Sequence, residues 1–243
     1  KALKAGAHGI ILADHTLIPA VRERYPSTKV IISTLNPTFN SQALRFLRGL
    51  GADLVVLERH LTLTEIDGLN RTAESIGLEL EVFVLNSACR FVNGSCSLHR
   101  TLLAGESGRW PGSPLSLLPN WQPCSEPVRL TVTDAAGGEE AFDDGFSLDG
   151  GLGHYCGLCA LFRLHRSGVA AVKVGGRGYP TGKKLLDMGL LARYADLIRR
   201  GAVTEDNFIE TGKSLYSETY GRPCGELECH YREIREKRKG TDP

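Results

Sequence analysis

Apolar and polar positions alternate in blocks along the first half of the chain, and each block has the length of one strand or one helix. Four short apolar runs rich in β-branched residues predict buried strands, at residues 8–14, 29–35, 53–59 and 78–85. Amphipathic stretches between these runs predict helices, at residues 18–24, 41–49 and 64–76. Gly49 and Gly77 stand where C-caps are expected. Strands that alternate with helices at this spacing indicate βαβ units and a parallel sheet.

A short sequence pattern recurs, in which a predicted helix is followed by a glycine, a small residue and then an apolar strand. It occurs at Gly6-Ala7, Gly51-Ala52 and Gly168-Val169. This repetition favours a (β/α) TIM-like barrel over an open α/β sheet. The chain opens at Lys1 on what reads as the tail of a helix, so we expect an N-terminally incomplete barrel. We predict a barrel domain over residues 1–180 and a C-terminal helical extension over residues 181–243.

The middle of the chain breaks the alternation. Residues 87–127 hold three cysteines and several glycines and prolines, which predicts a cysteine-rich loop insertion. Loops of this length inside a domain are usually functional. Beyond the loop, we predict strands at 128–134 and 169–174, a polar turn region at 135–144, and helices at 156–167, 183–200 and 227–239.

The overall composition is that of an ordinary globular domain, with 42% hydrophobic and 23% charged residues among 243. The 29 basic residues nearly balance the 28 acidic ones, so net charge offers no global argument for a nucleic-acid partner. No apolar run approaches the roughly 18 residues of a membrane span. The cysteine count of seven is odd, which with the α/β pattern favours a metal site in a reducing compartment over a disulfide framework. We therefore expect a cytoplasmic protein.

Polar side chains gather at the predicted carboxyl ends of the strands, where barrel enzymes place their active sites. Each could instead cap a helix or complete a rim hydrogen bond, but together they indicate a site. They are Asp14, His15, Ser33, Thr34, Asn36, Glu58, Arg59, His60, Asn86, Cys89, Lys173 and Arg177.

The cysteines suggest a metal centre. Cys89 and Cys96 flank a loop containing Asn93-Gly94, a tight-turn pair that can bring two thiolates together. Cys124 precedes a predicted strand, and Cys156 is expected to begin a helix, whose dipole favours a thiolate. Four thiolates from separate loops suit a [4Fe–4S] cluster. Zinc prefers close pairs such as Cys156/Cys159. Inert or redox-active thiols are a third interpretation, and spacing alone leaves all three open.

Several segments resemble, in sequence order, the collagenase-like peptidase family, U32. The strand 81–89 leads to Cys89 and is followed by the Gly-Ser-Cys of residues 94–96, as in the family signature. The segment 57–66 is similar to the family's Leu-x-Arg-Glu-Leu-Ser-Leu-x-Glu-Ile run. Residues 123–129 match a cysteine before a Pro-x-Arg turn. The block from Cys156 to Arg177 is similar to a Cys-to-Lys-Ile-Glu-Gly-Arg block.

The resemblance implies a [4Fe–4S] cluster bound by Cys89, Cys96, Cys124 and Cys156, with Cys159 as a substitute for the fourth ligand. The resemblance covers roughly residues 1–180, so it assigns no role to the two cysteines beyond that range. Cys224 and Cys229 could form a second metal or redox pair, or be surface thiols. The chain departs from the family where His-Gly becomes Leu85-Asn86 and where a glutamate becomes Gly175.

Three functions compete. The resemblance implies an iron–sulfur enzyme of oxygen-independent hydroxylation, acting on a small aromatic ring, as in ubiquinone biosynthesis, or on an RNA pyrimidine. Its candidate catalytic, anion-binding residues are Arg59, His60, Lys173 and Arg177. The second function is a peptidase, with Cys159 beside His154 or His165 as a conceivable nucleophile pair. The third is a non-catalytic cluster-bearing subunit, in a heterodimer with a family paralogue.

Overall fold

The protein is described by a computed structural model that covers residues 5–86, 92–95, 130–142, 155–176, 179–201, 204–225 and 228–236. Five strands form one sheet in which every neighbouring pair is parallel. In sheet order they are β1 (Gly9–Leu12), β2 (Lys29–Ile32), β3 (Leu54–Val56), β4 (Glu79–Leu85) and β7 (Ala171–Val174). The predicted α/β class and parallel sheet are confirmed, and closure of the sheet into a barrel stays a prediction.

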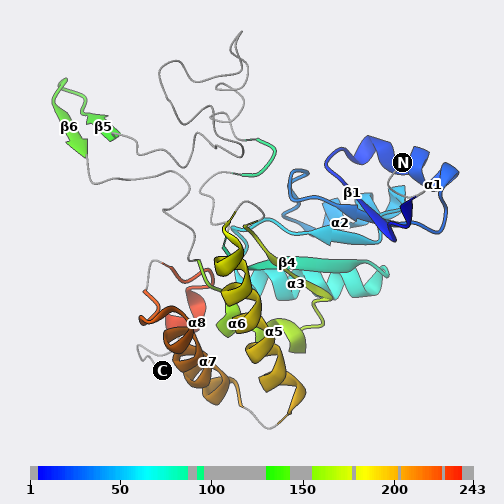
Figure 1. The fold of residues 1–243 in the computed structure, drawn as a ribbon. Coiled ribbons are helices and arrows are strands. Elements are labelled where there is room, and N and C mark those ends of the chain that lie inside the picture. The colour runs from blue at the N-terminus through cyan, green and yellow to red at the C-terminus, as the bar shows by residue number, and fades with distance from the viewer. Residues whose placement is uncertain are drawn as a thin grey trace, which may run out of the picture.

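Helices connect the strands and cover one face of the sheet (Figure 1). They are α1 (Ile18–Arg24), α2 (Ser41–Leu50) and α3 (Leu63–Ser75), close to the predicted ranges. Thr62 begins α3 with a capping box, in which its side chain accepts from Glu65 N and the Glu65 carboxylate accepts from Thr62 N. Helix α2 runs through Gly49 and ends at Gly51, whose φ of 109° only glycine adopts without strain.

The two faces of the sheet belong to different apolar clusters. Most buried side chains of the strands pack against the helices in one large core. The opposite face carries a smaller cluster built on Leu54, Val56 and Phe83. Burial on both faces explains why the strands read as nearly continuous apolar runs in the sequence.

A two-stranded antiparallel hairpin follows the cysteine-rich segment, formed by β5 (Leu130–Thr133) and β6 (Glu139–Phe142). It stands apart from the sheet in Figure 1. The predicted strand at 128–134 is confirmed, but the polar stretch 135–144 was wrongly interpreted as turn alone. Only its beginning is a turn, where Asp134 Oδ1 accepts from Ala136 N and Gly138 N. Glu139 and Glu140 lack the apolar alternation that marks a half-buried strand, which is why the sequence did not reveal β6.

The helix predicted at 156–167 begins later than expected. A single 3-10 turn at Leu158–Ala160 leads into α5 (Leu161–Arg166). Cys156 itself is extended and forms bridges with Leu85 and Cys229. Its backbone N–H donates to Glu228 O at 2.8 Å, and the next N–H, of Gly157, donates to Val84 O at 2.7 Å. These bonds hold the segment between β4 and the C-terminal segment, so Cys156 does not occupy a helix N-terminus.

Two long helices and one short one complete the described chain: α6 (Thr181–Arg199), α7 (Glu205–Tyr220) and α8 (Glu233–Glu236). Helix α6 confirms the prediction at 183–200, whereas α7 was missed. The helix predicted at 227–239 is confirmed only over α8, because the described residues before Glu233 form turns, a bend and the bridge at Cys229. Tyr194, Phe208 and Tyr216 belong to the same core as the sheet residues. The domain boundary at 180 stays a prediction.

Among the described residues, no helix combines the length and the apolar character needed to cross a membrane.

Candidate functional site

The strand ends of β2 and β3 meet at a buried carboxylate. The Glu58 side chain is 0% exposed and accepts four hydrogen bonds. Its Oε2 accepts from Arg59 N at 2.9 Å and contacts His60 Nδ1 at 3.2 Å. Its Oε1 accepts from Asn93 N at 2.9 Å and from the Thr34 hydroxyl at 3.4 Å. The predicted strand-end residues thus include the carboxylate itself, Glu58, and three of its direct partners, Thr34, Arg59 and His60.

The Asn93-Gly94 turn packs onto the same strand ends. Ser95 N donates to Val92 O at 3.2 Å, which confirms the tight turn that the dipeptide predicted. Asn93 Nδ2 donates to the Thr34 hydroxyl at 3.0 Å. A Cβ on Gly94 would stand 2.1 Å from Leu35 O, so this close approach requires glycine. The turn belongs to the segment between Cys89 and Cys96, and it docks at the predicted site.

Two predicted cations lie together on the sheet face opposite the helices. The Arg59 guanidinium carbon is 4.5 Å, and the Lys173 Nζ 6.0 Å, from the centre of the Phe83 ring. Lys173 also forms an ion pair with Glu81 at 3.0 Å. Strand pairing explains the arrangement, because Lys173 of β7 lies beside Phe83 of β4. Two carboxylates accompany these cations, because Glu81 pairs with Lys173 and Glu58 accepts from the Arg59 backbone N–H.

A second polar network lies where β4 meets α6. Asn86 has a φ of 59°, a left-handed conformation that asparagine tolerates. Its side-chain amide donates to Asp187 Oδ2 at 2.8 Å and accepts from Lys183 Nζ at 3.0 Å. Asp187 also accepts from the Tyr220 hydroxyl at 2.6 Å. The sequence identified Asn86 but not Lys183 or Asp187, whose i, i+4 spacing on a helix was the available signal.

Burial alone would raise the pKa of Asp187. Hydrogen bonds from Lys183, Tyr220 and Asn86, together with the charge of Lys183, outweigh that effect and hold the pKa below its usual range. Asp187 is therefore a structural carboxylate that fixes the carboxyl end of β4 against α6.

The remaining described strand-end residues follow β1 and β2. Asn36 Nδ2 contacts His15 Nδ1 at 2.7 Å, and Asp14 caps the turn that follows β1 by accepting from Thr16 N at 2.9 Å. Ser33 Oγ accepts from Leu35 N at 3.2 Å. The Asp14 and Ser33 contacts are local capping interactions and the Asn36–His15 contact is a hydrogen bond at the rim, the two alternatives that the sequence left open. Arg177 and Cys89 lie outside the described residues.

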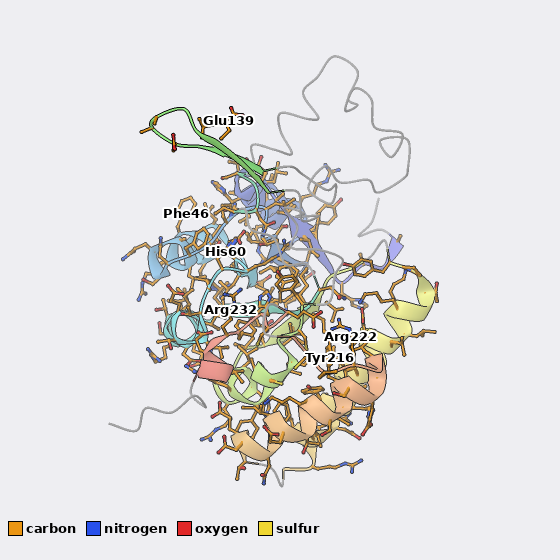
Figure 2. All side chains as sticks on the ribbon, turned by 90° about the vertical axis from the view of Figure 1, so that its left-hand side faces the viewer. Phe46, His60, Glu139, Tyr216, Arg222 and Arg232 are labelled. Carbon is orange, nitrogen blue, oxygen red and sulfur yellow. The ribbon has the colours of Figure 1, made fainter. Side chains whose placement is uncertain are left out.

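The cysteines near the C-terminus line one cavity. Cys156, Cys159, Cys224 and Cys229 surround about 30 Å³ of free space, together with Tyr194, Tyr216, Tyr231, Lys213 and Glu228. All four cysteines are reduced thiols. In Figure 2, Tyr216 and Arg222 mark this region, on the side formed by α7 and the segment that follows it.

The cavity walls are fixed by backbone bonds and by one carboxylate. Cys156 and Cys229 pair as adjacent extended residues, and His230 N donates to Cys156 O at 3.0 Å. The Glu228 carboxylate accepts hydrogen bonds from both terminal nitrogens of Arg222, at 2.7 and 2.9 Å. It also accepts one from Gly225 N at 2.9 Å. These bonds clamp the loop that carries Cys224 and Cys229. The sequence indicated Cys224 and Cys229, with four residues between them, as a possible second metal or redox pair, but not that they share a cavity with Cys156 and Cys159.

Two of the four thiols, those of Cys156 and Cys159, have raised pKa values. Burial, followed by the proximity of the other cysteines, raises the pKa of Cys156 well above its usual range. Burial likewise raises the pKa of Cys159 to about 11. Cys159 contacts the Tyr194 hydroxyl at 3.7 Å, while His165 is exposed on α5. The other conceivable partner of Cys159, His154, lies outside the described residues.

His230 connects the cavity to the strand-end site. Burial, with the neighbouring charges of Arg59 and His60, lowers the pKa of His230 to about 4. The residues on either side of it, Cys229 and Tyr231, line the cavity. Tyr231 also donates from its hydroxyl to Phe83 O at 2.8 Å. One extended segment thus contributes thiol and phenol groups to the cavity and an imidazole to the strand-end site.

Only one of the four cluster ligands implied by the resemblance is described. Cys156 is buried in the thiol cavity, whereas Cys89, Cys96 and Cys124 lie outside the described residues. In the described part of the chain, no three His, Cys, Asp or Glu side chains are already disposed around a single metal ion.

Sequence comparisons give a family match over most of the chain. The sequence model of Peptidase family U32 matches residues 1–218. "tRNA hydroxylation protein P1" of Bacillus subtilis is 32% identical over 105 residues, which are 43% of this chain and 24% of that protein. "tRNA hydroxylation protein P" of Escherichia coli is 29% identical over 96 residues, 40% of this chain and 21% of that protein.

The protein of the same name from Haemophilus influenzae is 32% identical over 89 residues, which are 37% of this chain and 19% of that protein. The matched stretches therefore span about a quarter or less of the length of these relatives. No solved structure matches the chain.

Proposed function

This chain belongs to Peptidase family U32, and on that premise we propose that it acts in the hydroxylation of a pyrimidine in tRNA, with an iron–sulfur cluster as cofactor. The names of its relatives support the reaction and the substrate. The structural observation that carries the proposal is the pair of cations, Arg59 and Lys173, that converge over Phe83 at the polar strand ends.

The cation pair suits an anionic substrate. Arginine and lysine side chains supply most phosphate contacts in nucleic-acid complexes, and these contacts position the substrate. Lys173 is 30% exposed at its side chain, so it can exchange part of its interaction with Glu81 for a phosphate oxygen. Glu58 fixes the backbone of Arg59 and the ring of His60, which keeps the neighbouring side chains in place without a substrate.

The cluster is the part of the proposal that the family resemblance supplies, with Cys89, Cys96, Cys124 and Cys156 as ligands. Cys156, the described member of this set, is buried at a mostly apolar cavity, an environment that suits a thiolate-bound group. Such a cluster supplies single-electron transfer or activation of an oxygen donor. The residues of this chain would hold the RNA at Arg59 and Lys173 and keep water away from the thiols.

The proposal is tested by expressing the full chain in a bacterium that lacks its own tRNA hydroxylation proteins and measuring hydroxylated pyrimidines in total tRNA by mass spectrometry. The proposal expects the modified nucleoside to reappear. If it stays absent while the chain is folded and retains iron, tRNA is not the substrate, and hydroxylation of a small aromatic ring becomes the next assay.

The role of the cation pair has its own prediction. Arg59→Gln and Lys173→Gln should each weaken tRNA binding about tenfold at low salt and reduce the slope of log affinity against log salt by about 1. Arg24→Gln, an exposed arginine on α1, is the matched control and should leave affinity unchanged. Equal affinities for all three variants would show that the strand-end cations do not contact RNA.

A further inference from the structure

We propose that Glu58 is a positioning residue that couples cluster binding to tRNA binding. Its carboxylate ties the turn at residues 92–95, which lies between two of the implied cluster ligands, to the segment of Arg59 and His60. The inference rests on the proposed function for both the cluster and the tRNA substrate. It keeps the implied ligand set unchanged and gives Glu58 no contact with the metal.

The two oxygens of this carboxylate divide their partners between two segments of the chain. Oε2 accepts from Arg59 N at 2.9 Å and contacts His60 Nδ1 at 3.2 Å. Oε1 accepts from Asn93 N, also at 2.9 Å. Because the Glu58 side chain is fully buried, water cannot replace a partner that is lost. Each segment therefore depends on the same carboxylate for its position.

The turn has two further contacts with the end of β2. Asn93 Nδ2 donates to the Thr34 hydroxyl at 3.0 Å, and that hydroxyl lies 3.4 Å from Glu58 Oε1. Gly94 packs so closely on Leu35 O that no Cβ would fit between them. Of the residues that hold the turn, Glu58 is the one that also holds the segment of the substrate-binding cation Arg59.

The order of the chain places the same turn between two implied ligands. Six residues separate Cys89 from Cys96, and the turn occupies the last four of them. A segment this short has few conformations left once both of its ends are fixed. Fixing the two cysteines as ligands therefore favours the docked turn. Through Glu58, the docked turn holds the backbone of Arg59 and the ring of His60.

This arrangement has a thermodynamic consequence for RNA binding. A cation that is already held in place loses less conformational entropy when it binds a phosphate. The chain with its cluster should therefore bind tRNA more tightly than the cluster-free chain, by about tenfold, which lies within the usual range of coupling between sites. Linkage is reciprocal, so tRNA should favour the docked turn by the same factor.

Two substitutions break the tie in different ways. Glu58→Gln keeps the shape of the side chain but has one acceptor oxygen, so the backbone N–H of either Arg59 or Asn93 loses its partner. Asn93→Pro leaves Glu58 in place and removes the N–H of the turn. Gly94 has a φ of 74°, whereas Asn93 is not left-handed, which is the pattern of a type II turn with proline favoured at the position of Asn93.

Asp187→Asn is the matched control. It alters the other almost fully buried carboxylate of the strand ends, whose partners are Asn86, Lys183 and Tyr220. None of these partners belongs to the turn or to the segment of Arg59. The control therefore lowers stability without touching the proposed coupling.

The experiment uses the full chain, reconstituted anaerobically with ferrous iron and sulfide, and a portion of it stripped with a chelator. Filter binding measures the Kd of both forms for tRNA from a bacterium that lacks tRNA hydroxylation proteins. Hydrogen exchange at residues 92–95 is followed with and without tRNA. Iron content and a melting curve are recorded for the native chain and for the three variants.

The inference expects the cluster to lower the Kd of the native chain about tenfold, as it should in Asp187→Asn despite a lower melting temperature. In Glu58→Gln and Asn93→Pro the two forms should have nearly equal Kd values. Addition of tRNA should slow exchange at the turn in the native chain but not in these two variants.

Three results would overturn the inference. Equal Kd values for the two forms of a native chain that retains iron and binds tRNA would refute the coupling alone. A native-like ratio in both Glu58→Gln and Asn93→Pro, or an equal loss in Asp187→Asn, would refute the role of Glu58. A native chain that binds no iron or no tRNA would refute the proposed function itself, and the coupling with it.

Discussion

At the scale of single residues, buried polar side chains explain how the strand ends keep their shape. Glu58 and Asp187 are both almost completely buried, and each accepts several hydrogen bonds from its surroundings. Burying a carboxylate is costly unless such partners are present. The two residues differ in their neighbours, because Asp187 is paired with a lysine whereas Glu58 is held mainly by backbone N–H groups and polar side chains.

The Asp187 network predicts an acid-dependent loss of stability. The pKa of Asp187 is lower in the folded protein than in the unfolded chain, so its contribution to the free energy of unfolding is full above the unfolded pKa of about 4. That contribution is lost as pH falls through the folded pKa. Asp187→Asn should lower stability by about 2 kcal/mol at pH 7, because an amide donor would face Lys183 and Asn86.

Urea unfolding between pH 7 and pH 3 measures this effect. The variant should lose less stability than the native chain over that interval, so that the two converge at low pH. A constant difference across the whole interval would show that the ionised Asp187 carboxylate is not the source of the stability.

At the scale of elements, α6 and α7 approach each other closely where Tyr194 faces Gly212. Tyr194 of α6 is fully buried, and a Cβ added to Gly212 of α7 would stand 2.6 Å from it. The glycine lets the two helices approach, although glycine lowers helix stability. A Cβ added to Gly189 of α6 would meet open space. Gly189 therefore lowers the stability of the helix without allowing a close contact in return.

This contrast predicts that replacing glycine with alanine changes the free energy of unfolding in opposite directions at the two positions. Gly189→Ala should raise the free energy of unfolding by about 1 kcal/mol, as expected for a helix interior. Gly212→Ala should lower it by about 1–3 kcal/mol, because Tyr194 must move within a packed core. Thermal unfolding of both variants measures the difference. Stabilisation by both substitutions would contradict the close packing of α6 on α7.

At the scale of the whole molecule, the C-terminal segment joins parts of the chain that are far apart in sequence. Tyr231 bonds to β4, and Glu233 Oε1 accepts from Leu63 N at the start of α3, at 2.7 Å. The same segment carries Cys229 and His230. Loss of this segment would therefore disturb the sheet, the thiol cavity and the strand-end site together.

The contact between Glu233 and α3 gives a prediction at this scale. Glu233→Ala should lower the free energy of unfolding by about 1 kcal/mol, since it removes a carboxylate that satisfies an N–H group at a helix N-terminus. Glu23→Ala, at an exposed position on α1, is the control and should change stability by less than about 0.5 kcal/mol. Guanidinium unfolding measures both values. Equal effects would contradict the docking of the C-terminal segment onto α3.

The sequence by itself determined the parallel α/β pattern, because apolar periodicity and glycine punctuation are local properties of the chain. It also identified most strand-end residues, since the end of a strand is visible where the apolar run stops. Asn93-Gly94 was recognised as a turn for the same reason. The limits of α5, the strand β6 and the helix α7 were not evident, because their local patterns are weak or mixed.

Only the tertiary structure decided which residues share a site. Arg59 and Lys173 meet over Phe83 because β4, which carries Phe83, lies between β3 and β7 in the sheet, although β7 is distant in sequence. Cys156 and Cys229 are brought together by backbone hydrogen bonds that any residue can form. The pairing therefore cannot be predicted from the pattern of side chains in the sequence. Local sequence sets propensity and periodicity, whereas the convergence of four thiols depends on how remote segments pack.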